Sequence, residues 1–355
     1  MDVHSLLAEV LAKGGSDLHL IAGAQPSMRL HGAIQRMDYP ALDGPTCDQM
    51  VRAILAHHHA ETLDREWQIS VSLELEDPRT QTPIGHFRVS VHLRGGIAEA
   101  AIRVTPRRIR TPEELGLPPV MKELVLRDSG LILVTGPTGQ GKTTTFNALI
   151  DHINQRRKLK IVTIEDPVEF RHQHQQSVVV QLEVGADTHT FADALRHALR
   201  EDPDVICVGE MRDLETIATA LTAAETGHLV IATLHTPSAV GTLSRIIDVF
   251  PAGQQEQVKV QLASVLTAVI TQRLLPRADG RGRVLATEVL ICTDAVRNQI
   301  REQKFHQVQN VMATSRAQGM QRLEDHLRQL LETGAISRAV AAGAANDVRA
   351  IQDLL

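Results

Sequence analysis

The sequence lacks several features that would assign it to particular classes of protein. It has no run of about 18 apolar residues, so we expect no membrane-spanning helix. Its three cysteines (Cys47, Cys207 and Cys292) are isolated, which excludes both a disulfide framework and a CxxC zinc site. The amino terminus, MDVHSLLAEVLAKGG, shows no basic-then-apolar signal peptide. Together these absences predict a protein of the reducing cytoplasm.

Aromatic residues and excess positive charge are also scarce. Aromatic residues make up 2% of the chain, and the formal net charge is −5. Proteins that bind single strands need aromatic side chains for base stacking, and most nucleic-acid binders carry a basic surface. We therefore expect no nucleic acid among the partners.

The composition that remains is typical of a globular protein, with 43% hydrophobic and 22% charged residues. A length of 355 residues corresponds to about two domains. In residues 1–105, few helices and several alternating runs favour a small α+β domain. The proline-rich residues 106–119 are expected to form a linker. The expected helices of the first domain are 3–12 and 47–63, and its expected strands are 17–21, 68–75, 85–93 and 97–104.

The pattern changes from residue 120 onward. Apolar runs that alternate with helical patterns predict a largely parallel sheet covered on both faces, hence an α/β core over residues 120–292. Residues 293–355 read as a helical C-terminal region. The expected strands of the core are 131–135, 161–164, 178–182, 205–208, 229–234 and 284–291.

The octet GPTGQGKT at residues 136–143 is the most specific motif. It lies between an apolar run and a helical pattern, the context that defines a P-loop. Its glycines allow a tight turn, so that backbone N–H groups and a helix N-terminus face a polyphosphate. Lys142 would neutralise the β- and γ-phosphates, and Thr143 would be a ligand for Mg²⁺. The predicted nucleotide-binding residues are Gly136, Pro137, Thr138, Gly139, Gln140, Gly141, Lys142, Thr143 and Thr144.

Acidic residues follow two of the expected strands. Ligands of a parallel sheet bind at the carboxyl ends of its strands, which is where Glu165 and Glu210 stand. One carboxylate can hold the metal while another orients and deprotonates the attacking water. We assign Glu210 to the metal and Glu165 to the water, with the two roles open to exchange.

Two histidines, His228 and His235, bracket the expected strand 229–234. Residues seven positions apart on a strand lie at opposite ends and on opposite faces, so the two cannot ligate one metal. His235 is expected near the γ-phosphate, where it could sense that group through a hydrogen bond. His228 is expected at the far end, in contact with a neighbouring domain or subunit.

Arginines of the first domain are further candidates. Arg88, Arg94 and Arg103 lie in or beside strands that precede the linker. A P-loop site commonly uses an arginine to stabilise charge in the transition state. Their number and position alone do not select them from the other arginines.

Several segments together resemble the secretion-superfamily ATPases. Segments 162–170 (VTIEDPVEF), 198–216 (ALREDPDVICVGEMRDLET) and 223–236 (AAETGHLVIATLHT) resemble the Asp, Walker B and His boxes of that superfamily, in its order. Segments 295–302 (AVRNQIRE) and 319–327 (GMQRLEDHL) narrow the resemblance to the type IV pilus retraction ATPases. Segments 16–32 and 85–96 are similar to the amino-terminal domain of the same family. The resemblance therefore covers nearly the whole chain.

This resemblance implies a RecA-like ATPase core, preceded by a PAS-like domain, in a homohexameric ring. The ring would hydrolyse ATP with Mg²⁺ to drive pilus retraction and twitching motility. Arg88, Arg94 and Arg103 match arginines that complete the nucleotide site in the family, from the same or an adjacent subunit. The implied partners are an inner-membrane platform protein and the pilus machinery. The chain would then be cytoplasmic and peripheral at the inner membrane.

Three other functions stay open. Extension ATPases of pilus or type II secretion systems carry a longer amino-terminal part and a four-cysteine zinc insert, whereas this sequence opens on the SDLHL-containing domain with three scattered cysteines. A nucleic-acid translocase is disfavoured by the charge and the aromatic content. A non-catalytic nucleotide-binding partner of another motor is disfavoured because the acidic residues for hydrolysis are present.

Overall fold

The computed structural model describes residues 2–30, 32–76, 80–105 and 108–354, except for the side chains of residues 353 and 354. It divides into two compact units, Met1–Arg108 with Pro167–Arg171, and Ile109–Asp166 with His172–Leu355. The expected linker begins at residues 106 and 107, which lie outside the described residues. The predicted α/β fold class, with a smaller α+β part first and helices last, is confirmed.

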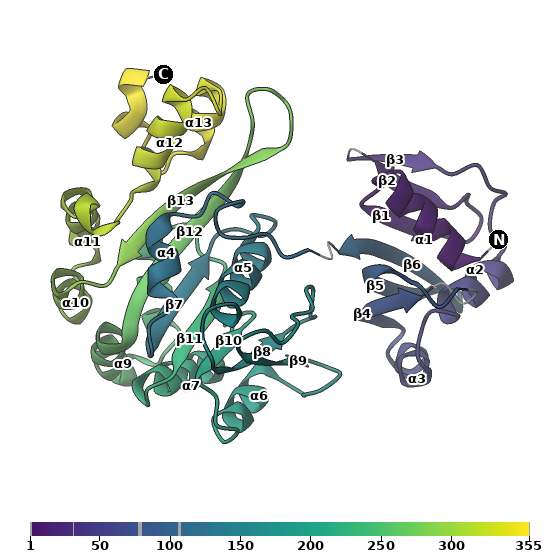
Figure 1. The fold of residues 1–355 in the computed structure, drawn as a ribbon, viewed down its shortest axis with the longest axis horizontal. Helices are drawn as coiled ribbons and strands as arrows, with labels where there is room; N and C mark the ends of the chain where they lie inside the picture. The colour runs from purple at the N-terminus through teal and green to yellow at the C-terminus, as the bar shows by residue number, and fades with distance from the viewer. Residues whose placement is uncertain (1, 31, 77–79, 106–107, 355) are drawn as a thin grey trace. The chain divides into compact units, whose positions relative to one another are not determined.

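A six-stranded antiparallel sheet of order β3-β2-β1-β6-β5-β4 forms the first unit, together with three helices (Figure 1). Alternation along β5 buries Phe87, Val89 and Val91 against one face of that sheet. The elements of this unit are α1 (Val3–Ala12), β1 (Asp17–Leu20), β2 (Ser27–Leu30), β3 (Ala33–Arg36), α2 (Gly44–Arg52), α3 (His57–Glu66), β4 (Gln68–Glu76), β5 (Pro83–Arg94) and β6 (Ile97–Thr105).

The expected single helix over residues 47–63 is wrong, because α2 ends at Arg52 and α3 begins at His57. The apolar stripe of α2, which buries Cys47, Met50 and Val51, reaches Ile54 just beyond the helix and does not continue at helical spacing into His57 and His58. A turn between the helices instead lets Leu63 become buried. The expected strands also omitted β2 and β3. All four residues of β3 are exposed, so β3 shows no alternation of buried and exposed side chains.

A seven-stranded sheet of order β13-β12-β7-β11-β10-β8-β9 forms the second unit, and all of its strands except β13 run parallel. Every residue of β7, β10 and β11 is buried, so these strands are covered on both faces. The elements of the core are α4 (Pro119–Leu124), β7 (Gly130–Thr135), α5 (Lys142–Asn154), β8 (Lys160–Glu165), β9 (Val178–Glu183), α6 (Phe191–Ala198), β10 (Val205–Val208), α7 (Leu214–Glu225), β11 (Leu229–Leu234), α8 (Ala239–Asp248), α9 (Ala252–Val265), β12 (Leu266–Pro276) and β13 (Arg283–Ile291).

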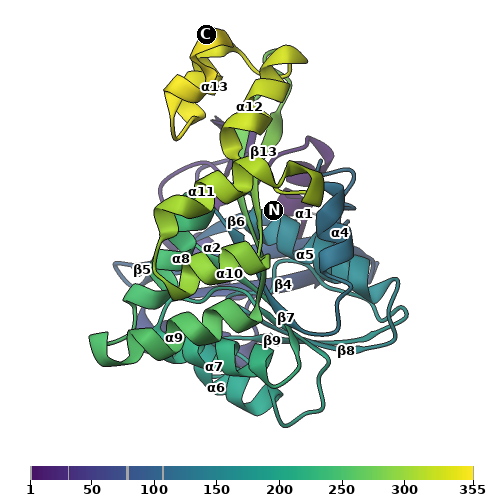
Figure 2. The ribbon, with the colours of Figure 1, turned by 90° about the vertical axis from the view of Figure 1, so that its left-hand side faces the viewer.

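Helices α9, α10 and α11 pack in sequence on one side of the second unit, as Figure 2 shows. Among the described residues, no helix combines the length and apolarity needed to cross a membrane. The C-terminal elements are α10 (Asp294–Arg301), α11 (Phe305–Thr314), the 3-10 helix η1 (Arg316–Gln318), α12 (Leu323–Glu332), α13 (Arg338–Ala344) and the 3-10 helix η2 (Val348–Leu354).

The strand β12 was not expected from the sequence. It follows α9 without a break, and most of its side chains are buried. Its first seven residues are buried whether they are apolar or polar, so the sequence has no alternation that marks a strand. In the structure β12 pairs with β7, the strand that leads into the P-loop.

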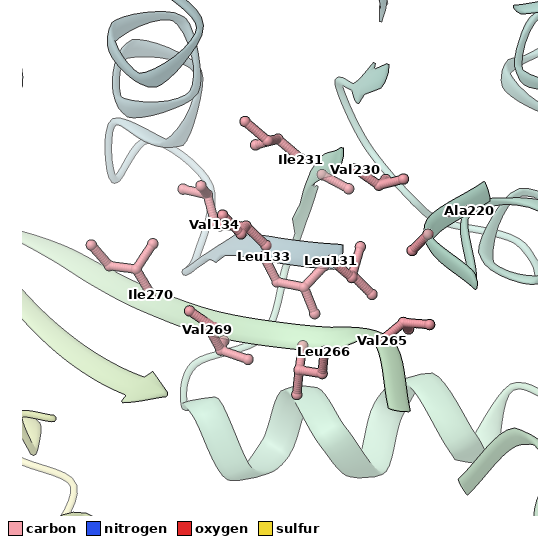
Figure 3. Packing of buried hydrophobic residues seen from close by; sticks show 14 of the residues in the cluster. Leu131, Leu133, Val134, Ala220, Val230, Ile231, Val265, Leu266, Val269 and Ile270 are labelled. Carbon is pink, nitrogen blue, oxygen red and sulfur yellow. The ribbon is translucent and has the colours of Figure 1, made fainter. Parts of the chain in front are cut away.

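The centre of the second unit's core lies along β7. Leu131 and Leu133 are fully buried, in register with Val230 of β11 and Val269 of β12, and Figure 3 shows these four residues. These side chains support the strand from which the P-loop emerges.

We predict that Leu133→Ala lowers the free energy of unfolding by about 2–5 kcal/mol, because it leaves a cavity among side chains that cannot fill it. Urea denaturation followed by circular dichroism measures the loss. Val260→Ala on α9 is the control, since Val260 is 57% exposed and its truncation should leave the urea midpoint nearly unchanged. Equal midpoints for the two variants would contradict the central place of Leu133.

Candidate active site

Four neighbouring parallel strands (β7, β11, β10 and β8) bring the predicted site residues to one edge of the sheet. The P-loop follows β7, His235 follows β11, Glu210 follows β10, and Glu165 ends β8. Carboxyl ends of parallel strands share an edge, so this arrangement follows from the strand order.

The P-loop is fastened to β12. A Cβ at Gly136, where φ is +141°, would lie 2.5 Å from the backbone oxygen of Gln272. The side-chain amide of Gln272 donates to the backbone oxygen of Gln140 at 2.7 Å, and Gln140 Oε1 accepts from the backbone N–H of Leu274 at 2.5 Å. Only glycine fits at position 136, and the loop cannot shift without breaking these bonds.

Helix α5 begins at Lys142, after Gly141 in the left-handed region with φ of +81°. Its first turn contains Thr143 and Thr144, and its N-terminus supplies free N–H groups for an anion. Lys142 Nζ donates to the backbone oxygens of Gly136 at 2.9 Å and Pro137 at 3.1 Å. Burial lowers the pKa of Lys142, and the carboxylate of Glu210 offsets part of that effect.

His235 connects the P-loop to Glu210. Its Nδ1 lies 3.2 Å from both Lys142 Nζ and Thr138 Oγ1, and its Nε2 lies 3.1 Å from Glu210 Oε1. An ammonium can only donate, so Nδ1 accepts from Lys142 and Nε2 carries the proton toward Glu210. This tautomer follows from the hydrogen-bond partners.

Glu210 is also held by an arginine that the sequence did not single out. Arg212 Nε lies 2.6 Å from Glu210 Oε1, and Arg212 Nη2 donates to Oε2 at 2.7 Å, a two-point ion pair. Burial raises the pKa of Glu210, but Arg212 and His235 outweigh it, so the pKa lies below its usual range. Glu210 is therefore a carboxylate at neutral pH.

Glu165 is 3% exposed at the end of β8. Its Oε1 accepts from Thr163 Oγ1 at 2.7 Å and from Gln181 Nε2 at 3.0 Å. Gln181 lies on β9, directly opposite Thr163 in the register of the two strands. The orientation of the carboxyl group is thus set by neighbours on two strands.

His172, in the loop between β8 and β9, contacts the P-loop helix α5. His172 Nε2 lies 2.7 Å from Asn147 Oδ1, and Asn147 Nδ2 donates to the backbone oxygen of Thr143 at 2.9 Å. Burial lowers the pKa of His172 to about 4. The imidazole is therefore neutral near pH 7.

The structure does not bring His228 to the P-loop. It stands before β11, at the other end of the strand from His235, and its Nδ1 lies 2.9 Å from the backbone oxygen of Ala223. Thr226 Oγ1 is a second neighbour of the same atom, at 3.2 Å. A contact of His228 with a neighbouring subunit stays a prediction.

Each of the three candidate arginines pairs with a carboxylate inside the first unit. Arg94 Nε donates to both oxygens of Glu99 at 3.0 Å, and Arg103 Nε donates to Asp17 Oδ1 at 2.9 Å. Arg88 Nη1 lies 3.5 Å from Glu169 Oε1, in the segment Pro167–Arg171 that belongs to this unit.

Sequence reasoning missed Arg212, Gln272, Gln181, Asn147 and His172. Gln272 left no signal in the sequence, since it stands between Thr271 and Arg273, and only the structure shows that it is buried. Gln181 depends on which strands are neighbours, and the order of strands along the chain does not reveal that. Arg212 and Asn147 bond to Glu210 and Thr143 close by in the sequence, and His172 bonds to Asn147 from the loop between β8 and β9.

The model of one protein family, described as type II/IV secretion system protein, matches residues 2–349 of the chain. The chain is 44% identical over 321 residues to a twitching motility protein of Neisseria gonorrhoeae, covering 90% of this chain and 84% of that protein. It is also 44% identical over 338 residues to the type IV pilus retraction ATPase PilT of Pseudomonas aeruginosa, covering 95% and 96% of the two chains.

A solved structure supports the same relationship. The crystal structure of the pilus retraction motor PilT with bound ADP superposes with a TM-score of 0.92 at 45% identity, over 99% of both chains. The similarity therefore includes both units of the fold.

We predict that His172 makes stability fall in acid. Its folded-state pKa of about 4 lies below the ordinary value of 6.5, so the unfolded chain binds the proton first. Stability should therefore be lost as pH falls from 6.5 toward 4, by at most about 1.4 kcal/mol per pH unit. Urea midpoints of the wild type and His172→Gln, measured between pH 4.5 and 7.5, isolate this contribution. Parallel curves for the two proteins would rule out a depressed pKa.

Proposed function

The chain belongs to the type II/IV secretion system protein family, and on that premise we propose that it is an ATP-hydrolysing motor that retracts type IV pili. The observation that carries the proposal is the convergence of Lys142, His235 and Glu210 at the P-loop. Two relatives that align with most of the chain, at 44% identity, are named for twitching motility and for pilus retraction.

In this proposal the polyphosphate of ATP lies on the P-loop backbone and the N-terminus of α5 (Lys142–Asn154). The proposed contacts come from Gly136 to Thr144. Lys142 exchanges its bonds to the loop oxygens for the β- and γ-phosphates, and its charge stabilises the negative charge of the transition state. His235 keeps its proton on Nε2, where it faces the carboxylate of Glu210.

Hydrolysis requires one bond to form and one to break. The oxygen of water bonds to the γ-phosphorus while the bond from that phosphorus to the β,γ-bridging oxygen breaks. Glu165 accepts the proton of the water. Its carboxylate stands at the end of β8, which pairs with β10, and Glu210 follows β10 at the same edge of the sheet. The exchange of roles between Glu165 and Glu210 is the alternative arrangement.

The residues at this edge fit Mg²⁺, which favours one or two carboxylates together with hydroxyl, water and phosphate oxygens. Thr143 and Glu210 supply a hydroxyl and an ionised carboxylate. When bound there, Mg²⁺ would neutralise phosphate charge.

The proposed assembly is a homohexamer that works with an inner-membrane platform protein and the pilus machinery, at the cytoplasmic face. The proposed domains comprise residues 1–105, 120–292 and 293–355. Net charge of −5 argues against a nucleic-acid partner.

We predict Mg²⁺-dependent ATPase activity that Lys142→Ala reduces by more than about a hundredfold, because it removes charge stabilisation at the phosphates. Glu165→Gln should lower kcat by about 10²–10⁴-fold with nucleotide affinity kept. Glu210→Ala should also lose activity, and so should the wild type in excess EDTA. Phosphate release from purified protein measures all of these.

Lys158→Ala is the control for Lys142→Ala, since Lys158 is an exposed lysine just after α5 (Lys142–Asn154). It should hydrolyse ATP at the wild-type rate. Wild-type activity no higher than that of Lys142→Ala would favour the non-catalytic partner. In cells that lack the gene, pili that extend but do not shorten are expected, and normal shortening would count against retraction.

We predict that Arg88→Ala and Arg103→Ala keep nucleotide affinity but lose turnover, if these arginines act on the transition state. Arg94→Ala should differ, because it leaves Glu99, which is 3% exposed, without its main partner and lowers the melting temperature. Binding of ADP by calorimetry and phosphate release separate the two effects. An equal loss of affinity and turnover in all three variants would assign them to folding alone.

A further inference from the structure

A chain of hydrogen bonds connects the P-loop helix to Glu165. It begins at the backbone oxygen of Thr143, passes through Asn147 and His172, and reaches Gln181 on β9. The amide of Gln181 then donates to Glu165. All five residues belong to the second unit, and this chain joins two elements of the candidate site by side chains outside the P-loop.

The donors and acceptors at the helix end of this chain have one consistent assignment. A backbone oxygen only accepts, so the Asn147 side chain turns its NH₂ toward Thr143 and its Oδ1 toward His172. His172 must then carry its proton on Nε2, at 2.7 Å from Asn147 Oδ1. The other ring nitrogen, Nδ1, is buried and has no hydrogen-bond partner among the described residues.

That buried nitrogen shows that packing alone does not explain His172. An unpaired polar atom in the interior costs free energy of folding, which an aliphatic side chain of similar size would avoid. The neutral imidazole provides a single directed N–H to Asn147. A residue that destabilises the fold while making one specific bond is expected where function needs the geometry.

The strand end of the chain acts on Glu165 itself. The backbone N–H of His172 donates to Gln181 Oε1 at 2.8 Å, which directs the amide nitrogen of Gln181 toward Glu165. Gln181 and Thr163 both donate to Glu165 Oε1. A carboxylate held by two donors on one oxygen has a fixed rotation about its side chain, as the orientation of an attacking water requires.

We propose that His172 and Gln181 are positioning residues, which hold Glu165 in register with the first turn of the P-loop helix. The inference rests on the proposed function, in which Glu165 orients and deprotonates the water. Neither residue touches the nucleotide in this account. His172 acts through Asn147 and through its own backbone N–H, and Gln181 acts on Glu165 directly.

Substitutions at Gln181 test its bonds to His172 and to Glu165. Gln181→Met removes both of them and should lower the single-turnover hydrolysis rate by about tenfold, with ADP affinity within about twofold of wild type. Gln181→Glu keeps the acceptor for His172 but places a carboxylate oxygen against Glu165, so its loss of rate should be deeper. Gln173→Met, at an exposed position of the same loop, is the matched control and should hydrolyse ATP normally.

Substitutions at His172 test the bond to Asn147, since every variant keeps the backbone N–H. His172→Leu should lower the rate by about threefold to tenfold with affinity kept. His172→Gln should restore the rate to within about twofold of wild type, because a glutamine amide can place an N–H where ring Nε2 stands. Urea midpoints confirm that each variant is folded under the assay conditions.

The outcomes distinguish this inference from the proposed function. If Glu165→Gln keeps the wild-type rate, the assignment of Glu165 is wrong and the positioning role is lost with it. If Glu165→Gln is inactive but Gln181→Met is normal, only the positioning role is overturned. Three further outcomes would overturn the positioning role. They are a His172→Gln variant that hydrolyses ATP as slowly as His172→Leu, a Gln181→Glu variant with the wild-type rate, and an equal fall of ADP affinity and rate in the variants. In a protein that already carries Glu165→Gln, Gln181→Met should cause no further loss of hydrolysis rate.

Discussion

The close approach of the P-loop to β12 is the constraint on which the rest of the site depends. Gly136 lies so near the backbone of Gln272 that no side chain fits, and Gln140 accepts two hydrogen bonds from β12, one at its backbone oxygen and one at its side-chain oxygen. The start of α5, and with it Lys142, is thereby fixed relative to the sheet. Because His235 and Glu210 follow strands of that same sheet, their distances from Lys142 are set by strand pairing and not by flexible loops.

Two polar connections run outward from this fixed point. The first joins Lys142 to His235, Glu210 and Arg212, and it sets the tautomer of His235 and the charge of Glu210. The second joins Thr143 to Glu165 through the loop between β8 and β9. Both start at neighbouring residues of one helix turn. A small change at the phosphates therefore has a short path to each acidic residue.

The sequence was sufficient for the class of fold and for the approximate position of the site. The P-loop octet and the acids after apolar runs depend on local order along the chain, which periodicity and spacing report. Strand β12 could not be predicted, since a run buried on both faces has no period of its own. Arg212 and Gln181 could not be predicted as partners either. Gln181 reaches Glu165 because β9 pairs with β8, which is decided by packing across the sheet. Arg212 lies only two residues after Glu210, but spacing along the chain does not report which way its side chain turns.

The setting of Lys142 has a consequence for how the molecule divides its stability and its affinity. Lys142 is 8% exposed, and the bonds of its ammonium go to loop oxygens and to His235. Its water shell was therefore removed when the chain folded, and a ligand that replaces those oxygens meets a cation that is already dehydrated. The free-energy cost of dehydrating the ammonium therefore lowers the stability of the folded protein. An anion that binds there does not bear that cost again. At this one side chain, what lowers the stability of the fold raises the affinity for an anion.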